Sequence, residues 1–477
     1  MIKKPLYIRS ICGIFPDAKD IETFWKNLLR ADIANSESLS SYWGEDKDEY
    51  SRSEKDGHIY MDHGYLANYP KVEGELPRQL NAGLDVIKKI IKNSYLEGKE
   101  EDISLVLASE WTDHSWYQEV LGKIGPGKGF SVERQVETLQ QKAGLGGVAL
   151  AVDTACASSL YGLDLARGIL ETGLSEHVIV LGLNMYLHSF LYRGFSKLGA
   201  LSKRGILSSF DSEADGIVPG EAVCAVLLNN DFNGALAEVD GIGLSTDGNE
   251  GSAFSPGYNG QLEAYRRAYN DSSLESSQID YLEAHGTATI LGDQTEIKSI
   301  HDFFLRTKEN EIIVGACKSN IGHTLAASGL ASVIKACCII KEKMIPPHIP
   351  INQNPLLEQK GIRILDRKKK INKNRVAVGV SSFGFGGSNA HVVIKTAEEI
   401  NSLDKAKNEN RKTFIRSRAF FNDVESSWPG ILLKGVPMGP RMQERIDPFQ
   451  RIVLSGIQEI IKKTQLTPDE RDRLYCI

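Results

Sequence analysis

The stretch Val148–Leu160, VALAVDTACASSL, passes from an apolar, β-prone run into a turn of small residues around Cys156. Leu163 and Ile169 continue an apolar pattern at helical spacing, and Gly173 is a suitable stop. We therefore predict a buried strand, a turn and a helix, with Cys156 at the helix N-terminus. Unpaired N–H groups at such an end favour a thiolate, so Cys156 is a candidate nucleophile.

The alternative for Cys156 is a buried small hydrophobe without chemistry. We prefer that interpretation for five other cysteines, which lack the strand–turn–helix setting: Cys12, Cys224, Cys317, Cys337 and Cys338.

Two histidines downstream of Cys156 are candidates to act with it. His285 lies in YLEAHGTATILGD and His323 in KSNIGHTLAASG, and each follows a strand-like run and is bordered by small residues. A histidine can donate a hydrogen bond to a thioester carbonyl or act as a general acid or base. Either one alone could equally be a core or capping residue. No histidine pair has zinc-ligand spacing and no CxxC pair occurs, so we predict no metal site.

Together these stretches resemble the β-ketoacyl synthases, or ketosynthases, particularly those of polyketide and polyunsaturated-fatty-acid synthases, over about residues 5–394. The resemblance implies an α/β thiolase fold, with two pseudo-repeated halves in α-β-α-β-α layers. It also implies an acyltransferase of the 3-oxoacyl-[acyl-carrier-protein] synthase type. Such an enzyme joins an acyl thioester to a malonyl-type acyl-carrier-protein thioester by decarboxylative Claisen condensation, in polyketide or fatty-acid biosynthesis.

The resemblance also assigns the chemical roles. Cys156 would hold the acyl group, while His285 and His323 would polarise the incoming thioester and assist loss of carbon dioxide. Lys318, five residues before His323, would order the site electrostatically rather than act as a nucleophile.

Further matches concern the walls of the site. Thr287 and Thr289 correspond to threonines that hydrogen-bond the phosphopantetheine arm of the carrier protein. Phe385, in the glycine-rich run VSSFGFGGSNAHVVI, would gate the pocket and offer its N–H, beside that of Cys156, to the oxyanion hole. A glycine-rich run can also cradle phosphate, but this one leads into a strand-like run that contains His391, so that alternative is weaker.

The sequence departs from the family pattern in places. Ala288 and Ala326 stand where many members have glycine, which would tighten the phosphopantetheine tunnel. Ser332 stands nine residues after His323, where fatty-acid-type synthases place a glutamate, and this favours the polyketide type.

Strand-like runs alternate with helical ones in two series, which predicts sheets covered by helices. The first series is 102–108, 148–152, 178–183 and 222–228, and the second is 236–242, 279–283, 312–316, 376–380 and 391–395. We assign a ketosynthase domain to residues 1–396, with halves at about 1–230 and 231–396. Cys156 falls in the first half and both histidines in the second, so the site is expected where the halves meet.

Residues 397–413 are charged and Asn-rich, which is typical of a solvated linker. The tail, residues 414–477, contains IDPFQRIVLSGIQEIIKK and resembles the start of a second ketosynthase-like domain. The alternative is a C-terminal helix folded back on the first domain.

Composition favours a cytoplasmic enzyme. The net charge of −6, with no basic stripe, argues against nucleic-acid binding, and no apolar run is long enough for a membrane helix. Seven cysteines without regular spacing suit a reducing compartment. We expect no bound cofactor, because the phosphopantetheine arm comes with an acyl carrier protein. We further expect an acyltransferase in trans, and a homodimer or a heterodimer with a ketosynthase-like subunit.

Two other functions stay open. A non-catalytic chain-length or dimerisation partner of another ketosynthase would share the fold, but such partners usually lack the cysteine or a histidine that this chain retains. An acyltransferase that passes the acyl group from Cys156 to an alcohol or amine would use the same nucleophile. The presence of both His285 and His323 argues against it.

Overall fold

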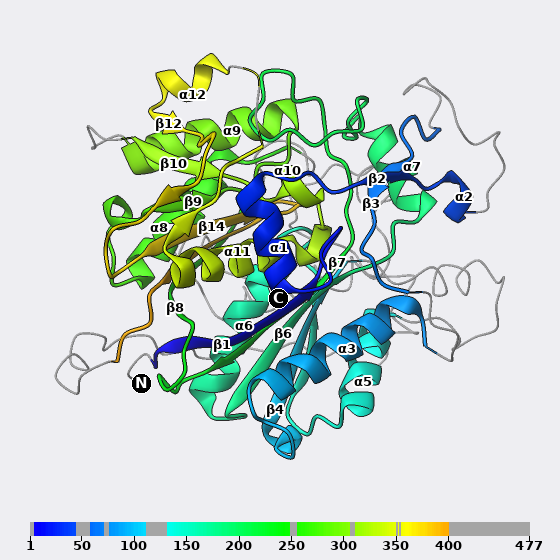
Figure 1. Ribbon diagram of the computed structural model, residues 1–477, viewed down its shortest axis with the longest axis vertical. Coiled ribbons are helices and arrows are strands. Elements are labelled where there is room, and N and C mark those ends of the chain that lie inside the picture. Colours follow the sequence, from blue (N-terminus) through cyan, green and yellow to red (C-terminus); the bar gives the residue numbers. More distant parts are fainter. Residues whose placement is uncertain are drawn as a thin grey trace, which may run out of the picture. The chain divides into compact units, whose positions relative to one another are not determined.

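A computed structural model describes residues 4–43, 58–70, 76–110, 131–248, 255–305, 311–349, 352 and 354–399 (Figure 1). The predicted linker, apart from its first three residues, and the predicted tail lie outside these ranges. Both therefore stay predictions.

The N-terminal half contributes five strands to the sheet, in the order β5-β4-β6-β7-β1. They are β1 (Leu6–Ile14), β4 (Ile103–Ser109), β5 (Ala149–Val152), β6 (His177–Asn184) and β7 (Ala222–Asn229). β4 runs parallel to β5 and β6, whereas β7 is antiparallel to β6 and β1. The helices of this half are α1 (Ile21–Arg30), α2 (Ser40–Trp43), α3 (Arg78–Asn93), α5 (Val132–Ala143), α6 (Ser158–Thr172) and α7 (Ser189–Lys197).

The C-terminal half repeats this arrangement, in the order β10-β9-β14-β15-β8. Its strands are β8 (Ala237–Thr246), β9 (Tyr281–Glu283), β10 (Ile312–Gly315), β14 (Ala377–Phe383) and β15 (Ser388–Lys395). Again the first three pair in parallel and the last two pairings are antiparallel. Its helices are α8 (Tyr258–Asp271), α9 (Ile290–Ile300), α10 (Lys318–Ile321), α11 (Ser328–Glu342) and α12 (Pro355–Gln359). The predicted pseudo-repeat is confirmed.

The two half-sheets are joined because β1 also pairs with β8, Leu6 to Ile8 against Ala237 to Val239. Short strands complete the described architecture: β12 (Ile362–Arg363) extends the sheet beyond β10, β2 (Ser36–Ser38) pairs with β3 (His63–Tyr65), and β11 (Met344–Ile345) pairs with β13 (Lys369–Lys370).

Three apolar clusters show the layers. The central cluster joins α6 and α11 to the inner faces of both half-sheets, with Leu163 and Leu330 among its members. A second cluster packs α3 and α5 on the other face of β4 and β6, and a third packs α8 and α9 against β9 and β10 (Figure 1). The helices α6 and α11 approach closely, since a Cβ atom on Gly329 would lie 2.7 Å from Leu160 Cγ. The predicted α-β-α-β-α layering is confirmed.

The strand β1 is the main element that the sequence did not indicate. Its pairing with β7 shifts register between Ile8 and Ser10. Leu6 and Ile8 accordingly face the central cluster, whereas Cys12 faces the outer one. This irregularity breaks the two-residue alternation that identifies a strand. Within the described ranges, no helix has both the length and the apolar character needed to cross a membrane.

Candidate active site

The turn that carries Cys156 is strained and held by its own hydrogen bonds. Ala155 has φ 52°, in the left-handed region that costs an alanine about 1–2 kcal/mol. Ser158 Oγ donates to the carbonyl of Ala155 at 2.6 Å and accepts the N–H of Thr154 at 2.8 Å. Asp153 accepts the N–H of Ala155 at 3.0 Å. The helix α6 starts two residues after Cys156 and ends before Gly173, which confirms the predicted strand, turn and helix.

Residues of the C-terminal half hold the same turn from the other side. Ser382 Oγ, at the end of β14, donates to the carbonyl of Cys156 at 2.6 Å, and Ser328 Oγ, at the start of α11, donates to it at 3.2 Å. The loop after β14 lies so close that a Cβ atom on Gly384 would be 2.4 Å from the carbonyl oxygen of Thr154. Cys156 therefore lies where the two halves meet.

Cys156 is buried, with 3% of the residue exposed. Burial raises the pKa of Cys156 well above its ordinary value, and the Glu110 carboxylate raises it further. The positive charge of Lys318 and hydrogen bonds from the N–H groups of Phe385 and of Cys156 itself lower the pKa, but less. The N–H groups at the helix end thus favour the thiolate, as expected, but burial acts on the pKa in the opposite direction and has the larger effect. The structure does bring the Phe385 and Cys156 N–H groups to one sulfur.

The two candidate histidines lie together. Their ring centroids are 5.5 Å apart and the rings are nearly perpendicular, at 83°. His285 follows β9 and His323 lies between α10 and α11. Burial lowers the pKa of both histidines well below the usual value, and the charge of Lys318 lowers both pKa values further, so both rings are neutral at pH 7.

The tautomer of His323 follows from one backbone contact. The N–H of Leu325 donates to His323 Nδ1 at 3.1 Å, so Nδ1 is an acceptor and Nε2 carries the proton of the neutral ring. His285 Nδ1 is buried and has no hydrogen-bond partner among the described residues. Two neutral imidazoles at this distance can donate to one developing oxyanion.

Two carboxylates of α9 fix the backbone that carries His285. Glu296 accepts the N–H of His285 at 2.7 Å and the N–H of Gly286 at 2.8 Å, one on each oxygen. Asp293 accepts the N–H groups of Ala288 at 3.0 Å and of Phe210 at 2.6 Å. Burial raises the pKa of Glu296 to about 7 and the pKa of Asp293 to about 8. We did not predict either residue, although LGDQTE places both acids in the first two turns of α9.

A buried ion pair supports the segment before His323. Glu283, at the end of β9, accepts the N–H of Cys317 at 2.6 Å, and its other oxygen lies 2.7 Å from Lys335 Nζ on α11. Tyr281 donates to the same carboxylate at 2.7 Å. The pair thus ties β9 and α11 to the turn that precedes Lys318, whose buried side chain acts electrostatically on Cys156 and on both histidines.

The two threonines lie side by side, half-buried. Their hydroxyl oxygens, Thr287 Oγ1 and Thr289 Oγ1, are 3.0 Å apart. A Cβ atom on Gly292 would lie 2.3 Å from Thr289 Oγ1, so the absence of a side chain at Gly292 leaves these hydroxyls room. Between them, Ala288 has φ 61°, which explains why glycine suits this position.

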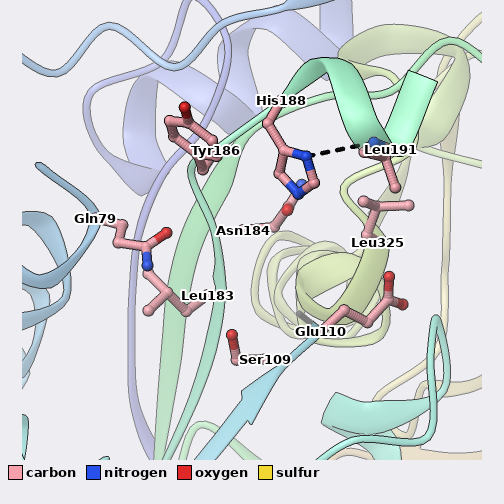
Figure 2. Close-up of a pocket in the computed structure, with 9 residues that line it drawn as sticks. All are labelled: Gln79, Ser109, Glu110, Leu183, Asn184, Tyr186, His188, Leu191 and Leu325. Atoms are coloured by element: carbon pink, nitrogen blue, oxygen red, sulfur yellow. Dashed lines mark hydrogen bonds between the residues drawn. The ribbon is translucent and has the colours of Figure 1, made fainter. Parts of the chain in front are cut away.

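A small pocket opens at the ends of β4 and β6 (Figure 2). Nine residues line it: Gln79, Ser109, Glu110, Leu183, Asn184, Tyr186, His188, Leu191 and Leu325. Glu110, one of these lining residues, also raises the pKa of the Cys156 thiol through its negative charge.

The sequence matches two family models in consecutive order. The β-ketoacyl synthase N-terminal domain matches residues 3–231, and the β-ketoacyl synthase C-terminal domain matches residues 236–352. The chain belongs to the β-ketoacyl synthase family. This family consists of acyltransferases. The boundary between the two models falls in the gap between β7 and β8. A third model, the ketoacyl-synthetase C-terminal extension, matches residues 350–421 and so includes the predicted linker.

Curated relatives show that this β-ketoacyl synthase is of the polyketide-synthase type. It is 36% identical over 273 residues to a phenolphthiocerol/phthiocerol polyketide synthase of Mycobacterium tuberculosis, which is 54% of this chain and 14% of that protein. It is 38% identical over 266 residues to the compactin diketide synthase of Penicillium citrinum, covering 53% of this chain and 10% of the relative. The chain therefore spans a small part of these relatives.

Solved ketosynthase structures share the fold. An oxazolomycin ketosynthase domain of Streptomyces albus matches with a TM-score of 0.76 and 24% identity, over 83% of this chain and 75% of that one. The PfaC keto synthase–chain length factor matches with a TM-score of 0.72 and 27% identity, over 83% of this chain and 49% of that one. The predicted thiolase fold is confirmed.

Proposed function

We propose that this β-ketoacyl synthase catalyses decarboxylative Claisen condensation, with Cys156 as the acyl-accepting nucleophile. The observation that supports the proposal most is a chain of contacts: the His285 and His323 rings lie 5.5 Å apart, the His285 ring lies 5.6 Å from that of Phe383, and the neighbouring Ser382 donates to the Cys156 carbonyl. No single half of the chain contains all of these groups.

The first half-reaction is acyl transfer to the cysteine. Cys156 Sγ attacks the thioester carbonyl, and the N–H groups of Cys156 and Phe385 stabilise the oxyanion of the tetrahedral intermediate. The carbon–sulfur bond of the donor breaks, and the departing thiolate takes the proton that the cysteine gives up. Because burial raises the pKa of Cys156, this proton has to leave in the course of the reaction rather than before it.

The second half-reaction is decarboxylation and bond formation. The carbonyl of a malonyl thioester accepts hydrogen bonds from His285 and His323, and these stabilise the enolate that forms as carbon dioxide leaves. The enolate carbon attacks the acyl group on Cys156, the carbon–sulfur bond to the cysteine breaks, and the thiol is restored by a proton. Imidazolium ions are not needed, since neutral rings with protonated Nε2 atoms suffice.

The proposal includes an acyl carrier protein as partner. Thr287 and Thr289 offer two adjacent half-buried hydroxyls to the phosphopantetheine arm, and an acyltransferase in trans would supply the malonyl group.

We also propose a dimer, with either a second copy or a ketosynthase-like subunit. In the described part of the sheet β5 is the edge strand, and its Leu150 is 37% exposed. An exposed apolar edge strand is a ready surface for strand pairing across a two-fold axis.

A second candidate is a non-catalytic subunit of the kind named in the PfaC structure, which combines a keto synthase with a chain length factor. The retained Cys156, His285 and His323 favour the enzyme. Acyl transfer to an alcohol or amine is the third possibility, and the same experiment separates all three.

The test is intact-mass measurement after incubation with acetyl, butyryl and hexanoyl thioesters of N-acetylcysteamine, followed by malonyl-N-acetylcysteamine. Condensation predicts an adduct that is absent from Cys156→Ala, and a β-ketoacyl product that is lost in His323→Ala while the adduct remains. An adduct that passes only to an added alcohol or amine indicates the acyltransferase. No adduct on folded protein indicates the non-catalytic subunit.

A further inference from the structure

The loop after β9 leaves the sheet as it reaches the first histidine. The N–H of Ala284 still bonds the carbonyl of Gly315 in β10, at 2.9 Å. The next two N–H groups, of His285 and Gly286, bond the carboxylate of Glu296 instead. The position of His285 therefore depends on side chains that hold the loop, rather than on strand pairing.

A serine hydroxyl from the N-terminal half holds the carbonyl of Gly286. Ser209 Oγ donates to this oxygen at 2.6 Å, and Ser209 is fully buried, so solvent does not compete for the bond. Gly286 has φ 47°, and a Cβ atom on it would lie 3.2 Å from Ser209 Oγ and 2.7 Å from Ala316 Cβ. Ser209 can come this close because Gly286 has no side chain. Glu296 and Ser209 together hold Gly286 at both its N–H and its carbonyl.

A second serine supplies a proton to the first. The single hydroxyl proton of Ser209 is used on Gly286, so Ser209 Oγ can only accept from other groups. Ser319 Oγ donates to it at 3.1 Å and accepts the N–H of Ser209, also at 3.1 Å. Ser319 directly follows Lys318 in α10, and His348 Nε2 lies further from its hydroxyl, at 3.5 Å. The two hydroxyls form a relay that joins α10 to the loop after β9.

The residue after Ser209 shows that this segment is held in a strained conformation. Phe210 has φ 65°, in the left-handed region that disfavours a bulky side chain. Its N–H donates to Asp293 at 2.6 Å, and its carbonyl accepts from Asn354 Nδ2 at 2.8 Å. Asp293 also accepts the N–H of Ala288, in the loop after β9. Strain of this kind persists where the surroundings impose it, and Ser209 and Phe210 thereby hold one loop at two points.

We propose, on the basis of the proposed function, that Ser209 is a positioning residue for His285. Together with Ser319 it fixes the loop after β9, so that the imidazole meets the carbonyl of the malonyl thioester. The Cys156 turn is held by separate hydrogen bonds, among them the one from Ser382 to the Cys156 carbonyl. The relay therefore serves decarboxylation and not acyl loading.

The test measures the two half-reactions of Ser209→Ala and of the wild type separately. Intact mass follows acyl loading of Cys156 by the butyryl thioester of N-acetylcysteamine, and carbon dioxide release follows decarboxylation of malonyl-N-acetylcysteamine. Ser209→Ala is expected to slow decarboxylation about tenfold or more, since a small displacement of His285 is enough for such a loss. Loading should stay close to that of the wild type. A general structural defect would instead slow both half-reactions alike.

Ser104→Ala is the matched control. Ser104 is also fully buried, accepts the N–H of Val148 at 2.8 Å and shares a hydrogen bond of 2.5 Å with the hydroxyl of Ser175. It lies near the start of β4, whereas the Cys156 turn follows the end of the parallel neighbour β5. This variant loses a comparable pair of hydrogen bonds away from His285, so the ratio of its two half-reactions should equal that of the wild type.

A double-mutant cycle tests the relay itself. Ser319→Ala should also slow decarboxylation more than loading. The double variant Ser209→Ala/Ser319→Ala should be little slower than Ser209→Ala alone, because the relay is already broken. Losses that multiply in the double variant would contradict the relay.

The inference is overturned if Ser209→Ala decarboxylates at the wild-type rate, or if its loading falls by the same factor as its decarboxylation. If Ser209→Ala does not fold, as judged by circular dichroism, Ser319→Ala decides, and it must lower decarboxylation relative to loading several-fold. A folded wild type that forms no adduct on Cys156 or releases no carbon dioxide contradicts the proposed function, and the inference falls with it. A wild type active in both half-reactions beside an equally active Ser209→Ala contradicts the inference alone.

Discussion

Replacing Glu296 with glutamine removes one of the two acceptors that hold the backbone of His285. In the structure, one carboxylate oxygen accepts the N–H of His285 and the other accepts the N–H of Gly286. Glutamine offers one acceptor and turns an NH2 group towards the other N–H. Because Glu296 is buried, solvent cannot restore the lost hydrogen bond.

The magnitude follows from that single unpaired donor. A buried N–H without a partner costs about 1–3 kcal/mol, and the opposed NH2 group adds repulsion, so we expect Glu296→Gln to lower the free energy of unfolding by about 2–4 kcal/mol. Displacement of His285 by a fraction of an ångström should slow malonyl decarboxylation about 10- to 100-fold. Acyl loading on Cys156 should fall much less, because Glu296 does not contact the nucleophile turn.

Urea denaturation measures the free energy of unfolding. Release of carbon dioxide from a malonyl thioester measures decarboxylation, and intact mass measures acyl loading of Cys156. The control is Glu263→Gln, whose carboxylate pairs with Arg267 at the surface of α8 and should change stability by no more than about 0.5 kcal/mol. The reasoning fails if Glu296→Gln is as stable as Glu263→Gln, or if both half-reactions slow by the same factor.

Two further predictions concern buried positions. Ala288 has a positive φ, which strains an alanine but not a glycine, whereas Ala326 does not. In thermal denaturation the Ala288→Gly variant should therefore be about 1–2 kcal/mol more stable than the Ala326→Gly variant. Equal stabilities would contradict the argument that Ala288 is strained. Burial lowers the pKa of His391 from 6.5 to about 3. Between pH 6.5 and pH 3 the unfolded chain therefore binds more protons at this residue than the folded chain does. The folded state accordingly loses stability as the pH drops below about 6.5. His391→Gln should remove about 3 kcal/mol of that loss between pH 6.5 and 4, measured by urea denaturation at each pH, whereas an unchanged pH dependence would show that His391 is protonated in the folded state.

The turn around Cys156 could be predicted because its signals are local. Apolar spacing, small residues and Gly173 all lie within one strand–turn–helix unit, and the structure follows them within a residue or two. The two series of strands in the halves could be predicted because each strand is marked by its own local run of apolar residues. β1 could not, because its register shift moves the apolar face from one side of the sheet to the other.

The carboxylates of the site could not be predicted, because nothing in the sequence distinguishes a buried acid from a solvated one. Glu296 becomes a backbone acceptor only when α9 packs beside the loop after β9, and Glu110 meets Cys156 only when β4 and β5 lie side by side. The neutral state of His323 likewise depends on burial and on the amide of Leu325. The resemblance singled out His285 and His323 from the sequence, but the closeness of their rings comes from tertiary packing.

The position of β1 has a consequence for synthesis on the ribosome. This first strand lies between β7 and β8, so that Tyr7 pairs with Asn229, about 220 residues later. At roughly 5–20 residues per second, β1 waits about 10–45 s after it is made before its partners exist. During that interval its apolar residues and open hydrogen-bonding edges are exposed, and pairings this distant in sequence form slowly. The strand that unites the two halves therefore stays unpaired while the rest of the N-terminal half is made.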